Sequence, residues 1–472
     1  REFKAELTLR VTDMLINEMM YGGSLKDIFQ SAYLMNLPEW FVKGAVNYVA
    51  LGWTVEMDDF VRQVIRTRQV KKLSRFTGRE AALIGQSLWN FIAERYGRSS
   101  ISNILNYTRI TRNEERSLVL TLGITYSKLL NEWQSYYAQM ESSVNQSYMS
   151  LQENMRLPVF QNRTTEFTTI KLSPDGRYLA YAENDRGSYR VKVRSLENGR
   201  ETTILSGGSK VINQRVDYRL PVINWADANT LGVIAVKNGG YTFWLYDLNT
   251  RTKIPRELDR FQNVRSISFS ANGRLAVVSA DYEGQSDLFL LSTRRDRVRR
   301  LTNDLFDDLD PSFIPGTNRI VFSSNRTTDS LRAKKPMLSD LTDNYNLFVF
   351  DLDTTNLVLQ RITNTLSNDY APLALNNDVY YYLSDQRGII NLFRYDRSTG
   401  IYAQVTNYTS SIVFYDLNPA TSQLALVTRQ RLYDDIYLDR NFNINRNVFT
   451  PATRRRELQQ AKIRSEERRV GK

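Results

Sequence analysis

The sequence predicts two domains of different fold class, an α-helical domain followed by an all-β domain built as a six-bladed β-propeller. Apolar residues recur with a helical period through the first 142 residues of the 472-residue chain. From residue 160 to residue 442 they instead alternate with polar residues in short segments. A strand–turn–strand pattern recurs six times in that second part, which is typical of a propeller.

The repeat is clearest over residues 167–185, which read FTTIKLSPDGRYLAYAEND. Ile170 and Leu172 alternate with polar neighbours, SPDG supplies turn residues, and a second alternating segment follows. Further strands are predicted at 189–194 and 201–205, so each unit is a four-stranded antiparallel sheet. Such a sheet cannot bury both of its faces without copies of itself. The matching turn residues are Pro174, Ala226, Ala271, Pro315, Asn376 and Pro419, in steps of 52, 45, 44, 61 and 43 residues.

Two short sequences connect this repeat with a known family. SPDGRYLAY is followed by strands and then by endings such as VRRLT at 298–302 and QRIT at 360–363. Together they resemble the repeat of TolB-type propellers, strongly in the first, third and fourth units. The resemblance implies a propeller over residues 160–442.

The N-terminal part is helical in pattern. Phe3, Leu7, Val11 and Leu15 form one apolar stripe, and further helices are expected from Pro38 to about residue 140. We expect a helical domain over 1–142, truncated at its N-terminus because the chain starts inside a helix. Residues 143–159 are a predicted linker, and 443–472 a C-terminal tail. The last ten residues, 463–472, resemble the translation of a sequencing adaptor.

A second resemblance lies in the helical part. The stretch 37–48, LPEWFVKGAVNY, is similar to the LPxWFxEGxAxY helix of gluzincin, or peptidase-MA-like, zinc peptidases. Fusion of that domain to a TolB-type propeller is known in bacterial envelope proteins. In the family the Glu of this helix is the third zinc ligand, and an earlier helix carries HExxH. The resemblance therefore implies a peptidase ancestor.

The catalytic positions of that family are replaced here. Lys43 stands at the ligand Glu, and Arg10, Val11 and Met14 stand at the positions of HExxH. Zinc binding by this motif needs two imidazoles one helical turn apart, and the chain contains no histidine. We therefore expect a pseudo-enzyme without metal or other cofactor. The alternative, an active zinc metallopeptidase with a substrate-binding propeller, requires residues that the sequence lacks.

Composition excludes further classes. Without His or Cys, the chain cannot form a Ser-His-Asp triad, a Cys-His dyad or a thiolate metal site. A prolyl-oligopeptidase-like hydrolase would need an α/β-hydrolase domain with a GxSxG elbow, which is missing. The sequence contains no run of 18 apolar residues, so it predicts no transmembrane segment. The net charge is +12, but the stretch 454–472 contributes +5 of it, so no nucleic-acid partner is expected.

Three charged segments offer binding hypotheses. The fourth unit carries an insertion at 328–343, where binding to a protein partner is expected because long propeller loops often bind. The acidic cluster Asp304, Asp307, Asp308 and Asp310 could hold calcium, but an acidic turn before Pro311 is the preferred interpretation. The arginines of 294–300 could bind anions, although a solvated blade edge is preferred. The residues predicted to bind the partner are Arg332, Lys334, Lys335 and Met337.

These observations favour a non-catalytic function, namely protein–protein interaction or scaffolding in a bacterial cell envelope. The family resemblance implies a periplasmic or outer-membrane-associated location.

Overall fold

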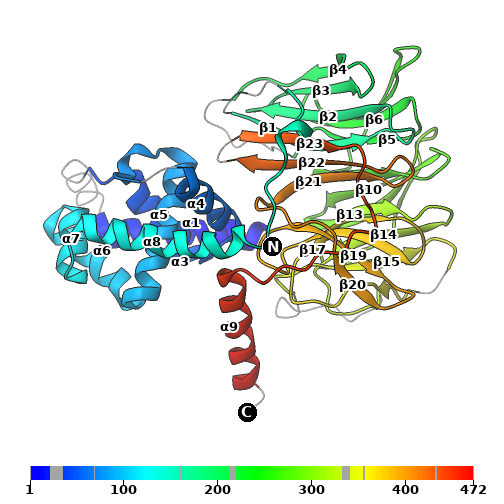
Figure 1. Ribbon diagram of the computed structural model, residues 1–472. Helices are drawn as coiled ribbons and strands as arrows, with labels where there is room; N and C mark the ends of the chain where they lie inside the picture. The colour runs from blue at the N-terminus through cyan, green and yellow to red at the C-terminus, as the bar shows by residue number, and fades with distance from the viewer. Residues whose placement is uncertain are drawn as a thin grey trace. The chain divides into compact units, whose positions relative to one another are not determined.

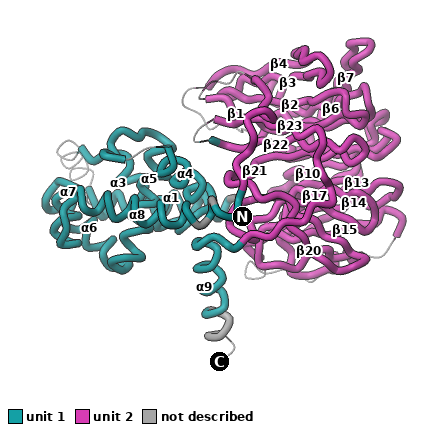
Figure 2. The backbone as a smooth tube through the Cα atoms, in the orientation of Figure 1, with its two compact units in different colours: residues 1–148, 430–432, 451–472 teal, residues 149–429, 433–450 magenta. Residues whose placement is uncertain are grey.

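The computed structural model describes residues 2–21, 36–67, 70–159, 162, 164–211, 219–331, 341–354, 357–430 and 433–470. The chain forms two compact units (Figure 2). Unit 1 comprises residues 1–148, 430–432 and 451–472, and unit 2 comprises residues 149–429 and 433–450. The predicted fold class is confirmed, because a helical region precedes a propeller of six antiparallel sheets.

Unit 1 is helical (Figure 1). A hydrophobic core that includes Trp40, Phe41, Trp89 and Trp133 holds its helices together. The helices are α1 (Glu2–Tyr21), α3 (Glu39–Leu51), α4 (Val55–Thr67), α5 (Gly78–Tyr96), α6 (Ser99–Thr111), α7 (Glu114–Leu122), α8 (Tyr126–Asn145) and α9 (Arg454–Val470), with 3₁₀ turns at Leu73–Arg75 and Glu153–Met155, the latter in unit 2.

The helices α3 and α5 approach each other backbone to backbone. Gly44 and Gly85 face one another at the crossing, and a Cβ on either residue would clash with backbone atoms of the other helix. The Trp89 indole donates a hydrogen bond of 3.0 Å to the carbonyl of Phe41 across the same contact. The glycine of the LPEWFVKG sequence is therefore explained by packing.

Helix α1 forms as predicted, but the apolar stripe that predicts it is not its buried face. Phe3, Leu7, Val11 and Leu15 are exposed in the structure. The residues that pack inward are Thr12, Ile16 and Met20, which lie on another side of the helix. The apolar stripe therefore predicts the presence of the helix but not the face that the helix buries.

Unit 2 is a ring of six sheets, each hydrogen-bonded in chain order from an inner to an outer strand (Figure 1). We number these blades 1 to 6. Among the described residues, the sheet of blade 6 has three strands, whereas each of the other sheets has four. The strands are β1 (Thr165–Leu172), β2 (Tyr178–Asp185), β3 (Ser188–Ser195) and β4 (Glu201–Gly207); β5 (Val222–Trp225), β6 (Thr230–Lys237), β7 (Gly240–Asp247) and β8 (Lys253–Glu257); β9 (Asn263–Phe269), β10 (Leu275–Tyr282), β11 (Gln285–Ser292) and β12 (Val298–Arg300); β13 (Asp308–Phe313), β14 (Arg319–Ser324), β15 (Asn346–Asp351) and β16 (Gln360–Arg361); β17 (Asp369–Ala374), β18 (Val379–Ser384), β19 (Asn391–Asp396) and β20 (Ile401–Gln404); β21 (Ile412–Asn418), β22 (Gln423–Gln430) and β23 (Tyr433–Asp439).

The ring closes through chain segments that are far apart in sequence. The N–H of Leu157 donates to the carbonyl of Ile436, and Arg156 bridges to Tyr437, so the segment before β1 lies along the outer strand of blade 6. At the inner edge, Asp416 of β21 accepts from the backbone N–H of Leu172 of β1 at 2.7 Å. The segment predicted as a linker at 143–159 thus contains the end of α8 and then joins the propeller.

The threonine that ends the VRRLT and QRIT sequences has a structural role. The Thr302 hydroxyl accepts from the N–H of Leu288 at 3.0 Å and donates to Asp287. Blades 4 and 5 repeat this arrangement with Thr363 and Thr406, each of which donates to an asparagine of its third strand. Each threonine satisfies a backbone donor where the outermost pairing ends.

Candidate functional site

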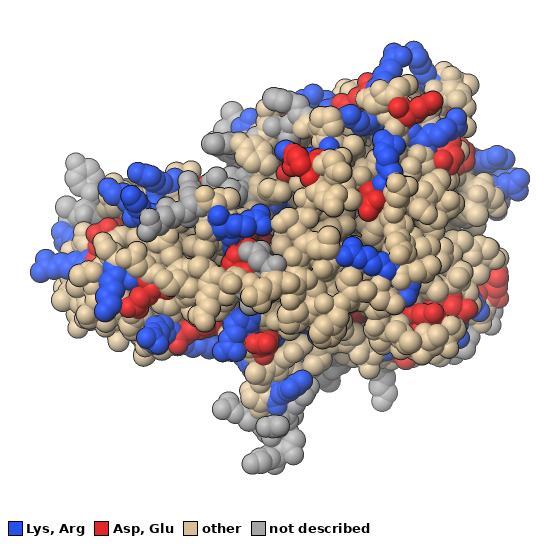
Figure 3. Space-filling model, viewed as in Figure 1, with Lys and Arg blue, Asp and Glu red and all other residues tan. Residues whose placement is uncertain are grey.

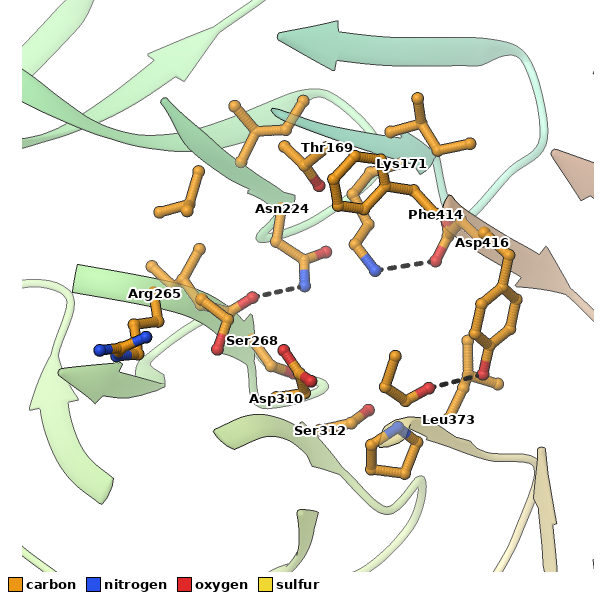
Figure 4. Close-up of a pocket in the computed structure, with 18 of the residues that line it drawn as sticks. Thr169, Lys171, Asn224, Arg265, Ser268, Asp310, Ser312, Leu373, Phe414 and Asp416 are labelled. Carbon is orange, nitrogen blue, oxygen red and sulfur yellow. Dashed lines mark hydrogen bonds and ion pairs between the residues drawn. The ribbon is translucent and has the colours of Figure 1, made fainter. Parts of the chain in front are cut away.

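The first strand of every blade lines a cavity of about 200 Å³ on the axis of the propeller (Figure 4). β1, β9, β13, β17 and β21 each carry a register irregularity next to this cavity. Such β-bulges redirect side chains. The polar groups of the channel therefore come from six segments spread over the whole repeat region.

Lys171 and Asp416 form an ion pair in the channel wall. The Lys171 ammonium lies 3.0 Å from the Asp416 carboxylate, and both side chains are largely buried. Burial raises the pKa of Asp416 above its usual value, while Lys171 and the N–H of Leu172 act in the opposite direction. Because β1 and β21 belong to the first and last blades, this pair joins the two ends of the ring.

The charge of Arg265 on β9 is compensated by Asp281 of the neighbouring strand β10. Its Nε and Nη2 donate to the two carboxylate oxygens of Asp281 at 2.8 and 2.9 Å. In Figure 4 its guanidinium points away from the middle of the cavity. Arg265 therefore fixes the wall rather than offering a free cation to a ligand.

Asp310 is different, since its carboxylate points into the cavity (Figure 4). The N–H of Ala371 and the hydroxyl of Ser323 lie close enough to lower its pKa, and among the described residues it has no ion-pair partner. Asp310 is partly exposed and lines the cavity. Burial raises the pKa of Asp310 above its usual range, although Lys171 and Arg265 lower it from a distance.

The backbone at Asp310 is left-handed, with φ 51°, and Pro311 follows. Blade 5 repeats this conformation at Ala371, also with φ 51° and followed by Pro372. The bulge is therefore a feature of the blades and does not require a carboxylate. An Asp tolerates this conformation better than an Ala does, but its charge in the channel is an addition to the fold.

The acidic cluster predicted around 304–310 does not converge on one point. Asp304 and Asp308 share the guanidinium of Arg326, which is fully buried and donates to both oxygens of Asp308 at 2.7 Å. Asp310 instead turns into the channel, and Asp307 accepts from the Tyr345 hydroxyl. Asp287, Asp304 and Asp308 have oxygens within 4.8 Å of one another, but each already forms an ion pair with Arg300 or Arg326. A divalent cation would have to displace a guanidinium, so this group does not fit a metal.

The residues that the resemblance aligns with the zinc-binding positions of gluzincins lie on α1 and α3, which pack against each other. Lys43 pairs with Glu39 at 3.1 Å, and Arg10 pairs with Glu6 at 3.0 Å, each within its own helix. Their side chains are 51% and 73% exposed, and Val11 and Met14 are exposed too. Both cations are thus solvated, and among the described residues neither lies at ion-pair distance from a carboxylate of another helix.

The residues predicted to bind a partner, Arg332, Lys334, Lys335 and Met337, lie outside the described residues. That hypothesis stays a prediction. The sequence analysis did not identify the channel residues Lys171, Asp310 and Asp416. The available signal was the pair Asp310-Pro311 and Ala371-Pro372, where equivalent positions of two blades differ only in the carboxylate.

No family model matches the chain, and no curated protein is significantly similar to it. Among solved structures, TolB from Acinetobacter baumannii is 14% identical, with 67% of this chain and 71% of that chain covered and a TM-score of 0.40. A putative TolB from Agrobacterium tumefaciens is 14% identical over 58% of this chain and 89% of that chain, with a TM-score of 0.38. An acylaminoacyl peptidase from Pyrococcus horikoshii is 16% identical over 56% and 42%, with a TM-score of 0.37. The six-bladed fold itself rests on the sheet topology described above.

Proposed function

We propose that the propeller is a non-catalytic protein-binding domain whose axial channel takes an extended segment of a protein partner. The observation that carries this proposal is the Asp310 carboxylate, which faces the cavity without a charged partner among the described residues. A lysine ammonium, an arginine guanidinium or a free α-amino group of the partner would complement it. Lys171 is paired with Asp416 and Arg265 with Asp281, so the described residues of the wall offer no competing free cation.

The composition supports a binding function over catalysis. A chain without His and Cys lacks the residues for the commonest nucleophile–base pairs and for the HExxH zinc motif. We therefore assign no catalytic residue and no cofactor. The partner is a protein and not a nucleic acid.

We further propose that unit 1 descends from a gluzincin-like peptidase and that the protein acts in the periplasm or at the outer membrane. The support is the LPEWFVKG sequence on α3, with Lys43 in place of the ligand Glu, and the resemblance of the repeat to TolB-type propellers. No helix among the described residues has the length and apolar character needed to cross a membrane.

The binding proposal is tested by peptide selection. Peptides selected from a random display library on the wild-type protein should contain a basic residue or a free amino terminus. Asp310→Ala should weaken their affinity about 10- to 100-fold, corresponding to about 1.5–3 kcal/mol for a hydrogen bond to a charged group. Asp259→Ala, which removes an exposed carboxylate elsewhere in the propeller, is the matched control. Equal affinity for wild type and Asp310→Ala would refute the proposed site.

The pseudo-enzyme proposal is tested by metal analysis. The purified protein should contain no stoichiometric zinc and should show no peptide hydrolysis. Stoichiometric zinc together with proteolysis that a chelator inhibits would overturn it.

A further inference from the structure

A dense group of arginines lies at the outer edge of blade 3. Six arginines line one shallow hollow of about 880 Å³. All six are exposed, and none of their guanidinium groups forms a hydrogen bond or an ion pair with another of the described residues. We call this group the arginine patch: Arg260, Arg274, Arg294, Arg295, Arg297 and Arg299.

The patch is held by the blade framework. The β9–β10 and β11–β12 turns lie side by side, because Thr293 donates from its N–H to the carbonyl of Arg274 at 3.0 Å. Arg256, from the outer strand of blade 2, donates from Nη1 to the carbonyl of Arg295 at 2.9 Å and also to the carbonyl of Ser292. The patch is therefore positioned by hydrogen bonds to two blades.

Negative charge at the patch is low. Asp296 is the single acidic residue among the described residues that line the hollow. On the face of the molecule shown in Figure 3, basic and acidic side chains are interspersed over the propeller. Six cations around one carboxylate give the hollow a positive potential that the mixed surface does not have.

Arg256 adds a second, independent sign of missing negative charge. Its Nε and Nη2 are buried and have no hydrogen-bond partner among the described residues, and no carboxylate lies within ion-pair distance. Burial lowers the pKa of Arg256, and nearby Arg260 lowers it further, while Asp296 acts in the opposite direction. The compensation that Arg256 receives comes from two backbone carbonyls and from the ring of Phe243, whose centroid lies 5.7 Å from its guanidinium carbon. An anion bound at the neighbouring patch would add the full negative charge that these groups lack.

Protection of the sheet edge does not account for six arginines. β12 is three residues long, and a short edge strand with one or two charges is already protected against pairing with another chain. The same short edge gives little room for strand addition by a peptide. No aromatic residue is found among the described residues that line the hollow, so stacking on nucleobases is not provided for.

We propose that the arginine patch docks the propeller on the phosphate headgroups of an anionic bilayer. A shallow, exposed hollow fits a planar array of phosphates better than it fits a single extended chain. Guanidinium groups pair with phosphate oxygens through two parallel hydrogen bonds. This surface is separate from the channel, so the inference goes beyond the proposed protein-binding function.

The test is co-flotation of the full chain with vesicles. Wild type should bind vesicles of phosphatidylcholine with phosphatidylglycerol but not vesicles of phosphatidylcholine alone. Binding should fall steeply as salt is raised from about 0.05 M to about 0.5 M, because surface charges are screened over a few ångströms at high salt. Replacing Arg294, Arg295, Arg297 and Arg299 by Ala should reduce the partition coefficient about tenfold or more.

The matched control removes the same charge from unit 1 by replacing the exposed residues Arg66, Arg75, Arg109 and Arg116 with Ala. It should stay within about twofold of wild type, since the effect depends on local charge density. Equal losses in both variants would mean that net charge alone is responsible and would overturn the proposal. Binding of soluble polyglutamate more tightly than the vesicles, at equal anionic charge, would assign the patch to acidic proteins and would also overturn it.

Discussion

Blades 4 and 5 share one framework, and two of the positions at which their side chains differ are informative. In both, an aspartate starts the inner strand, a left-handed residue precedes a proline at the bulge, and a serine ends the second strand. Blade 4 has Asp310 at the bulge and Arg326 two residues after its serine. Blade 5 has Ala371 and Gln386 at the same places.

The comparison distinguishes side chains that the fold requires from side chains that the fold can do without. The starting aspartates, Asp308 and Asp369, are both completely buried. Asp308 is neutralised by Arg326, whereas Asp369 is held by the hydroxyls of Ser384 and Thr365. Because blade 5 forms its bulge with Ala371, the Asp310 carboxylate of blade 4 is not required for the bulge. We therefore assign Arg326 to stability and Asp310 to binding.

The largest expected effect on stability is at Arg326. Its guanidinium also forms cation–π contacts with the rings of Phe306, Phe322 and Phe348. Arg326→Leu should lower the free energy of unfolding by about 3–5 kcal/mol, because Asp308 and Asp304 would be left buried without their cation. Urea denaturation measures this. Gln386→Leu, at the equivalent place in blade 5, should change the value by less than about 0.5 kcal/mol. Similar losses in both variants would refute the distinction.

A smaller effect is expected at Asp369, where burial raises the pKa to about 6 although hydroxyl groups donate to the carboxylate. The pKa is higher in the folded state than in the unfolded state, so the folded state binds the proton more tightly. Asp369 therefore lowers stability progressively as pH rises from about 4 to about 6, by about 2–3 kcal/mol in total.

The check is Asp369→Asn, followed by urea denaturation between pH 4 and pH 8. The variant should lack this contribution, so its free energy of unfolding should fall less with rising pH than that of wild type. Asp353→Asn, at an exposed site, is the control and should follow wild type. Parallel curves for wild type and Asp369→Asn would contradict a raised pKa in the folded state.

The repeat architecture could be predicted because its signals are local. Alternation in short segments and turns such as SPDG, where Ser173 donates to Asp175 and Gly176 has φ 70°, are encoded within a few residues. The candidate binding site in the channel could not be predicted in this way, because its residues come together only when the ring of blades closes. Lys171 and Asp416 lie in the first and last blades, and no spacing rule joins them.

The acidic cluster shows the same limit at shorter range. Asp308 and Asp310 are two residues apart, and an ordinary strand would place them on one face. The bulge at Asp310 breaks this alternation, so Asp308 meets Arg326 while Asp310 faces the channel. The sequence therefore predicts the acidic turn but not the separation of its carboxylates.

The most direct test of the central claim is the stability of Asp310→Ala. If Asp310 serves binding, removing its carboxylate, which has no ion-pair partner among the described residues, should change the free energy of unfolding at pH 8 by less than about 1 kcal/mol. The gain from losing a partly desolvated charge offsets the cost of Ala in a left-handed conformation. Urea denaturation of wild type, Asp310→Ala and Arg326→Leu in parallel gives the result. A loss of about 3 kcal/mol or more for Asp310→Ala would show that the carboxylate is a structural part of blade 4 and would contradict the account.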